Sequence, residues 1–347
     1  MKKYTIFGEK GESNILIGER ISNLERYIDA DHLFLVTDSN VRHLYEKNFP
    51  AGKVIEIGTG EKIKTIETVQ AIYKKLLEHE ADRSSFIIGI GGGIVCDITG
   101  FAASTYLRGV RFGFVSTTLL SQVDASVGGK NGVNFQGYKN MVGVFNQPEF
   151  VICDNAMLAT LPEKELLCGF AEIIKHAAIA DFKYFEYLEK NQSKALNLDS
   201  ATIEKVVYDS VQIKADVVNK DEREKGERKK LNFGHTFGHA VEKISGIPHG
   251  EAVSIGIAFA ADLSVKKGLL QQNEADRIIL LLKKYGLPSE IDVEAKLLAD
   301  AMEKDKKRSR DTIHFVLLES IGKAVIQTIA IDDLKNAIFD WQARRLG

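Results

Sequence analysis

Three of the eight histidines lie close together in "LNFGHTFGHAVEKISGIPHG", residues 231–250. His235 and His239 are four residues apart, so a helix would place both on one face. His249 follows the turn signal "GIP", which can fold the next helix back toward the first. These residue types and spacings allow three interpretations: a metal site, a set of proton-transfer groups, or ordinary histidines on a helix.

The histidine pair matches the H-E-x-x-H helix of zinc hydrolases only in part. Thr236 and Phe237 replace its glutamate step, which argues against that class of hydrolase. An open catalytic zinc site needs three protein ligands and a vacant position. Glu172, in the helical segment "GFAEIIKH", is the best carboxylate candidate, and Lys175 and His176 follow one turn later. Because the histidines are so concentrated, we expect a site here.

A second motif, "FIIGIGGGIVCD" (residues 86–97), runs from a strand into consecutive glycines and then a helix. Such a turn lets the backbone approach a phosphate, and the helix N-terminus supplies N–H donors and a partial positive charge. Ile94 stands where Gly89 and Gly91 would require the third glycine of G-x-G-x-x-G, and no Walker lysine follows. The motif favours a nucleotide-binding turn of a non-standard kind; the alternative is a tight strand-to-helix connection.

The segment "STTLLSQVDASVGGKNGVNFQGYKNMVG", residues 116–143, keeps neither helical nor strand periodicity for long. We interpret it as a long loop, and such loops in compact domains are often functional. A solvated surface loop is the alternative, although its first half is too apolar for water. Its polar residues suit a phosphate, a carboxylate or hydroxyls, and further bases lie downstream. They are Asp124, Lys130, Asn134, Lys139 and Asn140 in the segment, and Lys214, Arg228, Lys306 and Lys307 after it.

The overall composition narrows the class of protein. Apolar residues make up 44% of the 347 residues, and a net charge of -2 gives no reason to expect nucleic acid or a membrane as partner. The start of the chain lacks a signal peptide pattern, and no apolar run is long enough to span a membrane. Cys96, Cys153 and Cys168 lie in apolar contexts, as buried free thiols do. We expect a cytoplasmic protein.

The first part of the chain alternates strands with helices. Strands are predicted at 32–40, 53–65 and 113–119, a helix at 66–80, and a strand, glycine turn and helix at 85–105. This alternation indicates parallel βαβ units, which bind ligands at the carboxyl ends of their strands. Three of these ends carry Asp38, Glu61 and the Gly91–Gly93 turn.

After about residue 160 the pattern becomes helical. Helical spacing covers 163–190, 200–218, 250–267 and 274–285; a hairpin is predicted at 312–329 and a final helix at 331–345, capped by Asp332 or Asp333. The fold class is therefore α/β, with a Rossmann-like parallel-sheet nucleotide domain followed by a mostly α-helical metal and substrate domain. Because the chain exceeds the usual length of a single core, we expect two domains, 1–160 and 161–347.

Six blocks resemble the 3-dehydroquinate synthases, a family of the sugar-phosphate cyclases, in order and spacing. They are "GGGIVCDITGFAASTYLRG", "STTLLSQVDASVGGKNGVN", "YKNMVGVF", "LPEKELLCGFAEIIKH", "RKKLNFGHTFGHAVE" and "HGEAV". The resemblance runs from "VTDSN" to "DKK" and implies the dehydroquinate synthase-like fold. It also implies a lyase of the shikimate pathway that needs NAD and one divalent metal, zinc or cobalt, and that is commonly a homodimer.

The resemblance also assigns residues to roles. The implied metal ligands are Glu172, His235 and His249. The implied catalytic residues are Lys175, His239, Asp124, Lys214 and Asn232. The implied substrate contacts are Arg108, Asp124, Lys130, Asn140, Lys175, Lys214, Arg228, Asn232, His239 and Lys306. The implied NAD contacts are Asp38, Asn40, Glu61, Lys64, Gly92, Gly93, Asp97, Thr117, Thr118, Lys139, Leu158 and Thr160. Asn131 and Tyr138 depart from the family pattern, which commonly has threonine and glycine there.

The implied reaction converts 3-deoxy-D-arabino-heptulosonate 7-phosphate to 3-dehydroquinate and phosphate. NAD oxidises C5, phosphate leaves by β-elimination, hydride returns, and the opened ring closes by an intramolecular aldol reaction. Alternatives are a related cyclase, such as 2-deoxy-scyllo-inosose synthase or an epi-valiolone synthase, and a metal-dependent polyol dehydrogenase. Lys214, Asn232 and His239 favour the dehydroquinate branch, and a dehydrogenase would need fewer bases. A non-catalytic binding protein would not explain why ligands, lysines and glycine turn occur together.

Overall fold

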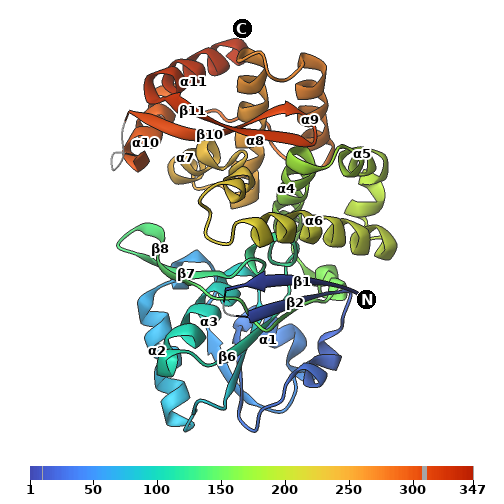
Figure 1. Cartoon of the computed structure of the whole chain (residues 1–347), viewed down its shortest axis with the longest axis vertical. Helices are drawn as coiled ribbons and strands as arrows, with labels where there is room; N and C mark the ends of the chain where they lie inside the picture. The colour runs from blue at the N-terminus through green and yellow to red at the C-terminus, as the bar shows by residue number, and fades with distance from the viewer. Residues whose placement is uncertain (10, 307–310, 347) are drawn as a thin grey trace. The chain divides into compact units, whose positions relative to one another are not determined.

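The computed structural model describes residues 1–9, 11–306 and 311–346, with side chains except at 303–306 and 344–346. The chain forms two compact units (Figure 1). The N-terminal unit contains residues 1–162 and 203–223, and the C-terminal unit contains residues 163–202 and those from 224 onward. The division into domains 1–160 and 161–347 stays a prediction. No helix in the described ranges is long and apolar enough to cross a membrane.

The N-terminal unit is built on a seven-stranded sheet with the order β1-β2-β9-β6-β5-β3-β4. Only β1 and β2 pair antiparallel; the other neighbours are parallel. Every residue of β5 is buried, as expected for a strand covered on both faces. The predicted parallel sheet is confirmed, with an antiparallel edge in addition. The strands are β1 (Lys2–Gly8), β2 (Gly11–Ile17), β3 (Leu33–Asp38), β4 (Lys53–Ile57), β5 (Phe86–Gly91), β6 (Arg111–Ser116) and β9 (Phe150–Cys153).

Helices and short helical turns complete the N-terminal unit. Asp38 ends β3 and caps α1, because its carboxylate accepts hydrogen bonds from the backbone N–H groups of Asn40 and Val41. The predicted strand 53–65 is wrong beyond Ile57, since Gly60 turns the chain with a φ of 80°. The helices are α1 (Ser39–Tyr45), α2 (Ile66–Glu78), α3 (Gly93–Thr105) and α6 (Ser200–Lys220). The short turns are η1 (Ile21–Tyr27), η2 (Glu46–Asn48), η3 (Glu61–Ile63), η4 (Tyr106–Arg108), η5 (Ser121–Ala125) and η6 (Asn155–Thr160).

The prediction of an irregular loop at 116–143, based on its lack of periodicity, is wrong. It contains the helical turn η5 and a separate hairpin of β7 (Lys130–Phe135) and β8 (Tyr138–Phe145). Gln136 and Gly137 join the two strands with φ of 47° and 81°, the conformation that a two-residue hairpin turn requires. Gln-Gly is a weak turn signal compared with Asn-Gly, which is why the hairpin was not evident from the sequence.

Helix α6 packs on the antiparallel edge of the sheet, which explains why residues 203–223 belong to the N-terminal unit. The hydroxyl of Tyr4 on β1 donates to the carboxylate of Asp216 on α6. One helical turn further, Asn219 accepts a hydrogen bond of 2.9 Å from the backbone N–H of Phe7. The edge strand and the helix are therefore joined along a shared face.

The C-terminal unit is mostly helical and surrounds α8, which is buried from Gly250 to Ser264 in nearly every turn. A helix that is apolar all round belongs in a core. Phe259 of α8 stacks on Phe237 with ring centroids 4.3 Å apart, and Trp341 packs edge-on against both. The elements are α4 (Glu163–Ala180), α5 (Phe182–Leu196), η7 (Glu227–Asn232), α7 (His235–Ser245), α8 (His249–Lys266), α9 (Gln272–Lys284), α10 (Ala295–Lys306), β10 (Thr312–Ser320), β11 (Lys323–Ala330) and α11 (Ile331–Leu346).

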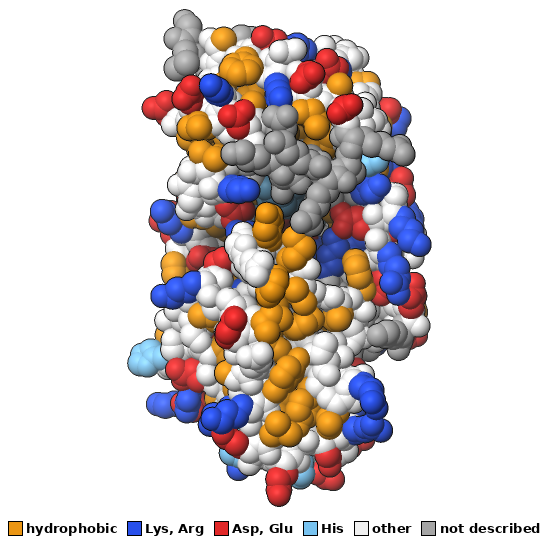
Figure 2. Space-filling model, turned by 90° about the vertical axis from the view of Figure 1, so that its left-hand side faces the viewer, with side chains coloured by type: hydrophobic (Ala, Val, Ile, Leu, Met, Phe, Trp, Pro, Cys, Tyr) orange, Lys and Arg blue, Asp and Glu red, His pale blue; other side chains and the backbone are white. Residues whose placement is uncertain are grey.

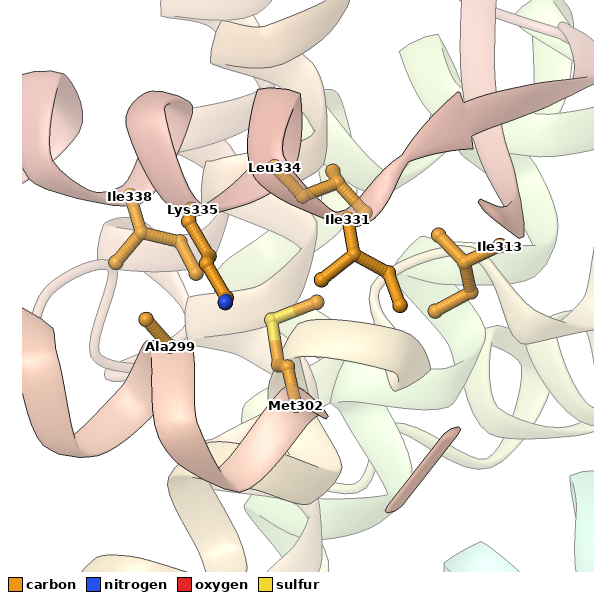
Figure 3. Close-up of a pocket in the computed structure, with 7 residues that line it drawn as sticks. All are labelled: Ala299, Met302, Ile313, Ile331, Leu334, Lys335 and Ile338. Atoms are coloured by element: carbon orange, nitrogen blue, oxygen red, sulfur yellow. The ribbon is translucent and has the colours of Figure 1, made fainter. Parts of the chain in front are cut away.

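The helical domain and its hairpin are confirmed, with two corrections. The predicted helix 163–190 is divided at Asp181, whose carboxylate accepts from the backbone N–H of Tyr184 and so caps a new helix. Asp332 and Asp333 are not N-caps, because α11 begins at Ile331 and both acids lie in its first turn. Figure 3 shows a small pocket where Met302 of α10 faces Ile331 of α11. Its lining is apolar apart from Lys335, so it lacks the converging polar groups of a ligand site.

Candidate functional site

Glu172, His235 and His249 come together inside the C-terminal unit. Glu172 lies in the middle of α4, and the two histidines are the first residues of α7 and α8. Oε1 of Glu172 is 3.4 Å from Nε2 of His235 and 3.5 Å from Nε2 of His249. One ligand atom from each residue lies within 4.8 Å of the other two. The three residues that the sequence suggested as metal ligands are therefore neighbours.

The spacing of these atoms suits a shared divalent metal. Two atoms bound at about 2.0–2.1 Å to a tetrahedral zinc ion lie roughly 3.3–3.4 Å apart. The observed 3.4 and 3.5 Å are close to this value. One carboxylate and two imidazoles leave a fourth position of a tetrahedral ion for substrate, which is the composition of a catalytic site.

Glycines allow the three helices to approach closely enough to form this group. A Cβ atom on Gly250, directly after His249, would lie 2.3 Å from Cα of Cys168 on α4. A Cβ atom on Gly256 would lie 1.9 Å from the carbonyl oxygen of Gly234, directly before His235. Any side chain at either position would separate the helices, so the geometry of the histidines depends on these contacts.

Charge compensation keeps the buried carboxylate ionised. The side chain of Glu172 is fully buried and forms an ion pair with Lys175, whose side chain is 1% exposed. Burial alone would raise the pKa of Glu172, but Lys175 and then His235 and His249 hold the pKa well below its usual value. For His249, burial lowers the pKa, whereas the carboxylates of Glu172 and Glu242 raise it to about 9. The group therefore presents a carboxylate ligand at neutral pH.

Other predicted residues lie near this group or elsewhere in the same unit. The ring of His239 meets that of His235 edge-on, with centroids 5.4 Å apart, and is exposed. His176 is fully buried on α4, and Arg228 is 2% exposed in η7. Nδ2 of Asn232 donates to Glu224 at 2.6 Å. Lys306 ends α10 with its side chain outside the described part, and Lys307 lies outside the described residues.

The predicted nucleotide residues gather at one edge of the N-terminal sheet. Strands β9, β6, β5, β3 and β4 are adjacent and parallel, so their carboxyl ends share one edge. The chain passes from β3 to β4 and then crosses to β5 on the other side of β3, and open α/β sheets bind ligands at such a reversal. The residues at these ends are Asp38 at the end of β3 and Asn40 after it, Glu61 after β4, Gly92 and Gly93 after β5, Thr117 and Thr118 after β6, and Leu158 and Thr160 after β9.

The glycine turn has the geometry needed for a close approach of the backbone. Gly92 is the N-cap of α3, and helix α3 begins at Gly93. A Cβ atom on Gly93 would lie 2.7 Å from Cβ of Ala125. The backbone N–H of Thr117 donates to the carbonyl oxygen of Gly91, which joins the ends of β5 and β6. Backbone N–H groups at a helix N-terminus bind anions, so the turn suits a pyrophosphate.

The hairpin β7–β8 is tied to this edge by a polar network around Lys64. Nζ of Lys64 lies 2.5 Å from Asp97 and 2.6 Å from Oδ1 of Asn140. Asn134 donates to Glu61 at 2.7 Å and accepts from the backbone N–H of Asn140 at 2.9 Å. Burial raises the pKa of Asp97, and the charge of Lys64 opposes that shift. The network holds the predicted cofactor and substrate residues together.

The remaining predicted residues of the N-terminal unit differ in their surroundings. Lys214 on α6 is buried and contacts Asp124 twice, at 2.5 Å to Oδ1 and 2.6 Å to the carbonyl oxygen. Arg108, Lys130 and Lys139 are exposed. Asn131, one of the two positions that differ from the family pattern, is buried. Its amide nitrogen donates to the carbonyl oxygens of Gly129 and Asn146.

Sequence reasoning did not single out Glu242, whose Oε2 is 3.3 Å from Nδ1 of His249. Its spacing from His235 and His239 is that of one helix face, which is the signal that would have found it. The predicted free thiols Cys96, Cys153 and Cys168 are all buried. Burial raises the pKa of all three thiols, that of Cys168 to about 11.

Comparisons with known proteins cover most of the chain. The family model for the N-terminal part of 3-dehydroquinate synthase matches residues 54–168, and the model for the C-terminal part matches residues 169–308. The 3-dehydroquinate synthase of Desulforamulus reducens is 46% identical over 307 residues, which is 85% of this chain and 86% of that protein. The 3-dehydroquinate synthase of Halorhodospira halophila is 42% identical over 332 residues, 92% of this chain and 94% of that protein.

Two solved structures of related cyclases are similar over nearly the whole chain. A 2-deoxy-scyllo-inosose synthase in complex with carbaglucose-6-phosphate, NAD+ and Co2+ has a TM-score of 0.87 at 26% identity, covering 97% of this chain and 99% of that one. A 2-epi-5-epi-valiolone synthase from Streptomyces hygroscopicus with NAD+ and Zn2+ bound has a TM-score of 0.87 at 27% identity, covering 95% and 96%. The fold is thus shared with two cyclases whose structures contain NAD+ and a divalent metal.

Proposed function

Since this chain belongs to the 3-dehydroquinate synthase family, we propose that it is a lyase that converts 3-deoxy-D-arabino-heptulosonate 7-phosphate to 3-dehydroquinate and phosphate. The reaction belongs to the shikimate pathway of aromatic amino acid biosynthesis. The observation that carries the proposal is the group of Glu172, His235 and His249, whose spacing suits one catalytic metal ion. The proposed cofactors are NAD and one divalent metal, zinc or cobalt.

The metal would be held by the Glu172 carboxylate and the two imidazoles, and NAD by the residues at the carboxyl edge of the N-terminal sheet. When bound, the metal would supply Lewis acidity toward substrate hydroxyls, and NAD would supply reversible hydride transfer. Lys175 keeps Glu172 ionised by its charge, and so maintains an anionic ligand. The carboxyl edge of this sheet also carries two acidic side chains, Asp38 and Glu61, and one basic side chain, Lys64.

The chain's own residues orient the substrate and move protons. We assign the acid end of the substrate to Lys214, which is held in place by Asp124. His239, exposed beside His235, is suited to transfer a proton to or from a substrate oxygen. The phosphate is assigned to bases and one amide: Arg108, Lys130, Asn140, Arg228 and Lys306. Such charges hold a dianionic leaving group through its departure.

Asn232 completes the proposed substrate contacts. Its amide nitrogen donates to Glu224, so its amide oxygen has a defined direction. Fixed donors and acceptors lower the entropic cost of bringing substrate atoms into reacting positions. The reaction then needs few general bases, because the departing phosphate can itself accept a proton.

A coupled assay tests the function. The purified protein with NAD+ and Zn2+ or Co2+ should release phosphate from the heptulosonate phosphate without net accumulation of NADH. Phosphate release from glucose 6-phosphate instead would assign it to the cyclase branch of the inosose synthase, whose structure contains a carba analogue of that sugar. Steady accumulation of NADH on a polyol, with no phosphate released, would identify a dehydrogenase.

We further propose a homodimer in the cytoplasm. Figure 2 shows hydrophobic side chains gathered on one face of the N-terminal unit. Phe135, Tyr138 and Met141 of the β7–β8 hairpin are each about half exposed, at 46%, 56% and 48%. Exposed apolar patches of this kind often mark protein interfaces. Light scattering at micromolar concentration should give twice the mass of the chain, and a monomer mass would contradict the dimer.

A further inference from the structure

His249 lies between two carboxylates, one at each ring nitrogen. Its Nε2 is 3.5 Å from Oε1 of Glu172, and its Nδ1 is 3.3 Å from Oε2 of Glu242. The side chain of Glu242 is only 14% exposed. A buried carboxylate costs free energy unless a partner compensates for it, and His249 provides such a partner for Glu242.

His235 is oriented in the same way as His249, but its Nδ1 has a different partner. Nε2 of His235 is 3.4 Å from Oε1 of Glu172, and its Nδ1 is 3.2 Å from the carbonyl oxygen of Phe233. Both imidazoles thus direct Nε2 to the shared carboxylate and Nδ1 to an oxygen acceptor. Histidines that bind metals donate their other ring N–H to a carboxylate or a carbonyl, which fixes the tautomer and the ring orientation.

The register of α7 explains how Glu242 reaches His249. His235, His239 and Glu242 are separated by four and three residues and therefore share one face of the helix. The helix ends at Ser245, its C-cap Gly246 has a φ of 68°, and the chain reverses before α8 begins at His249. The same face of α7 therefore presents a proposed ligand and an acceptor for the next one.

We propose that Glu242 is a positioning residue of the metal centre, which accepts the Nδ1–H of His249 and so directs its Nε2 lone pair toward the metal. The inference rests on the proposed function, because it assumes that Glu172, His235 and His249 hold a divalent metal. Glu242 itself does not contact substrate or metal. It acts by holding the ring and by increasing the basicity of the ligand nitrogen.

A second cation between His239, Glu242 and His249 is a less favourable interpretation, although one ligand atom from each of these residues lies within 4.8 Å of the others. Such a cation would need Nδ1 of His249 while Nε2 binds the first metal. A neutral imidazole has one lone-pair nitrogen and one N–H, so it would have to lose its second proton. Hydrogen bonding to Glu242 requires no such loss.

Metal affinity measured without NAD or substrate tests the inference. Apo protein is titrated with Co2+, and the visible absorption gives the dissociation constant, the stoichiometry and the spectrum of the bound ion. Glu242→Ala should raise the dissociation constant roughly 10- to 100-fold, with one ion bound per chain. Glu242→Gln keeps an acceptor oxygen without the charge and should give a smaller increase. Glu186→Gln, a surface glutamate of the same unit with a 4.0 Å ion pair to Lys190, is the matched control and should bind as the wild type.

Each other outcome overturns the inference. If Glu242→Ala binds Co2+ as tightly as the wild type, with the same spectrum, while His249→Ala loses binding, the proposed metal ligands stand and Glu242 does not position His249. Two ions in the wild type, with only the weaker one lost in Glu242→Ala, would make Glu242 a ligand. No binding to the wild type would refute the proposed metal group and this inference together. If Glu242→Ala does not fold, an unchanged affinity of Glu242→Gln decides against it.

Discussion

Glu172 is the residue on which the metal site depends, because its carboxylate is shared by both histidines. Its side chain has no exposure to solvent. A charge in such a position is costly unless it is paired. Lys175, three residues further along α4, supplies that pairing before any metal binds. Neighbouring positive charges, and not the residue type alone, keep this glutamate ionised.

The first prediction concerns this ion pair in the metal-free protein. Lys175→Met should destabilise the apo protein by about 3–5 kcal/mol, because it leaves a buried carboxylate without its main partner. The double variant Lys175→Met with Glu172→Gln should recover most of that loss. Urea unfolding in the presence of a chelator measures both values. Lys190→Met, on the exposed face of α5, is the control; an equal loss in the control would show that the ion pair contributes nothing.

At the scale of elements, close packing of α7 on α8 sets the distance between the histidines. Gly256 of α8 faces the carbonyl oxygen of Gly234, so that the two backbones are in direct contact. Gly238 of α7 likewise faces the carbonyl oxygen of Ala252, at 2.8 Å from its ideal Cβ position. These small residues are needed because longer side chains would move the first turns of the two helices apart.

The second prediction is that Gly256→Ala destabilises the protein and weakens metal binding. Helix propensity alone would stabilise a mid-helix Gly→Ala change by about 1 kcal/mol. The contact with Gly234 instead forces a backbone shift that costs roughly 1–3 kcal/mol. Thermal unfolding of the apo protein gives the sign, and Co2+ titration gives the affinity. A higher melting temperature would show that the two helices are not packed backbone to backbone.

The third prediction concerns the attachment of α6 to the sheet edge. Burial and then the hydrogen bond to Asp216 raise the pKa of Tyr4 to about 12, from 10.0 in a free side chain. A raised pKa contributes stability that is complete below pH 10 and is lost as the pH rises toward 12. Tyr4→Phe should therefore lose less stability than the wild type between these pH values, as measured by urea unfolding at each pH.

A control separates this effect from the general alkaline loss. Tyr73→Phe removes a hydroxyl that bonds to Thr105 in the same unit, and it serves as the control for the loss of one tyrosine hydroxyl. If Tyr4→Phe and Tyr73→Phe have the same pH dependence as the wild type, the Tyr4–Asp216 bond does not hold α6 in place.

At the scale of the whole molecule, the proposed cofactors belong to different units. The candidate metal ligands all lie in the C-terminal unit, and the candidate NAD residues all lie in the N-terminal unit. A ligand that binds only the folded state stabilises that state by mass action. Each cofactor should therefore raise the melting temperature through its own set of residues.

The fourth prediction separates the two sets. Metal or NAD at about 100 times its dissociation constant should each add about 2.7 kcal/mol to the stability of the state that binds it. His249→Ala should lose the shift caused by Zn2+ and keep the shift caused by NAD+, whereas Asp38→Ala should do the reverse. Differential scanning fluorimetry with and without a chelator measures this. Loss of both shifts in either variant would argue against separate sets.

Much of this protein was evident from local sequence patterns. Alternation of strands and helices predicted the α/β half, helical spacing predicted the second half, and the hairpin predicted at 312–329 matches β10 and β11. These features depend on the periodicity of side chains within one segment, which the sequence contains directly. The family blocks added the candidate ligands, whose roles remain proposals.

Only the tertiary structure decided the contacts between distant segments. It placed Glu172 against residues more than sixty positions later, added α6 to the N-terminal unit, and brought Glu242 to the second nitrogen of His249. Such contacts depend on how closely two backbones can pack and where the chain reverses, and glycines such as Gly250 and Gly256 control both. The sequence by itself determined which residues can do the chemistry; long-range packing decided which of them meet, because no local period encodes a distance between separate helices.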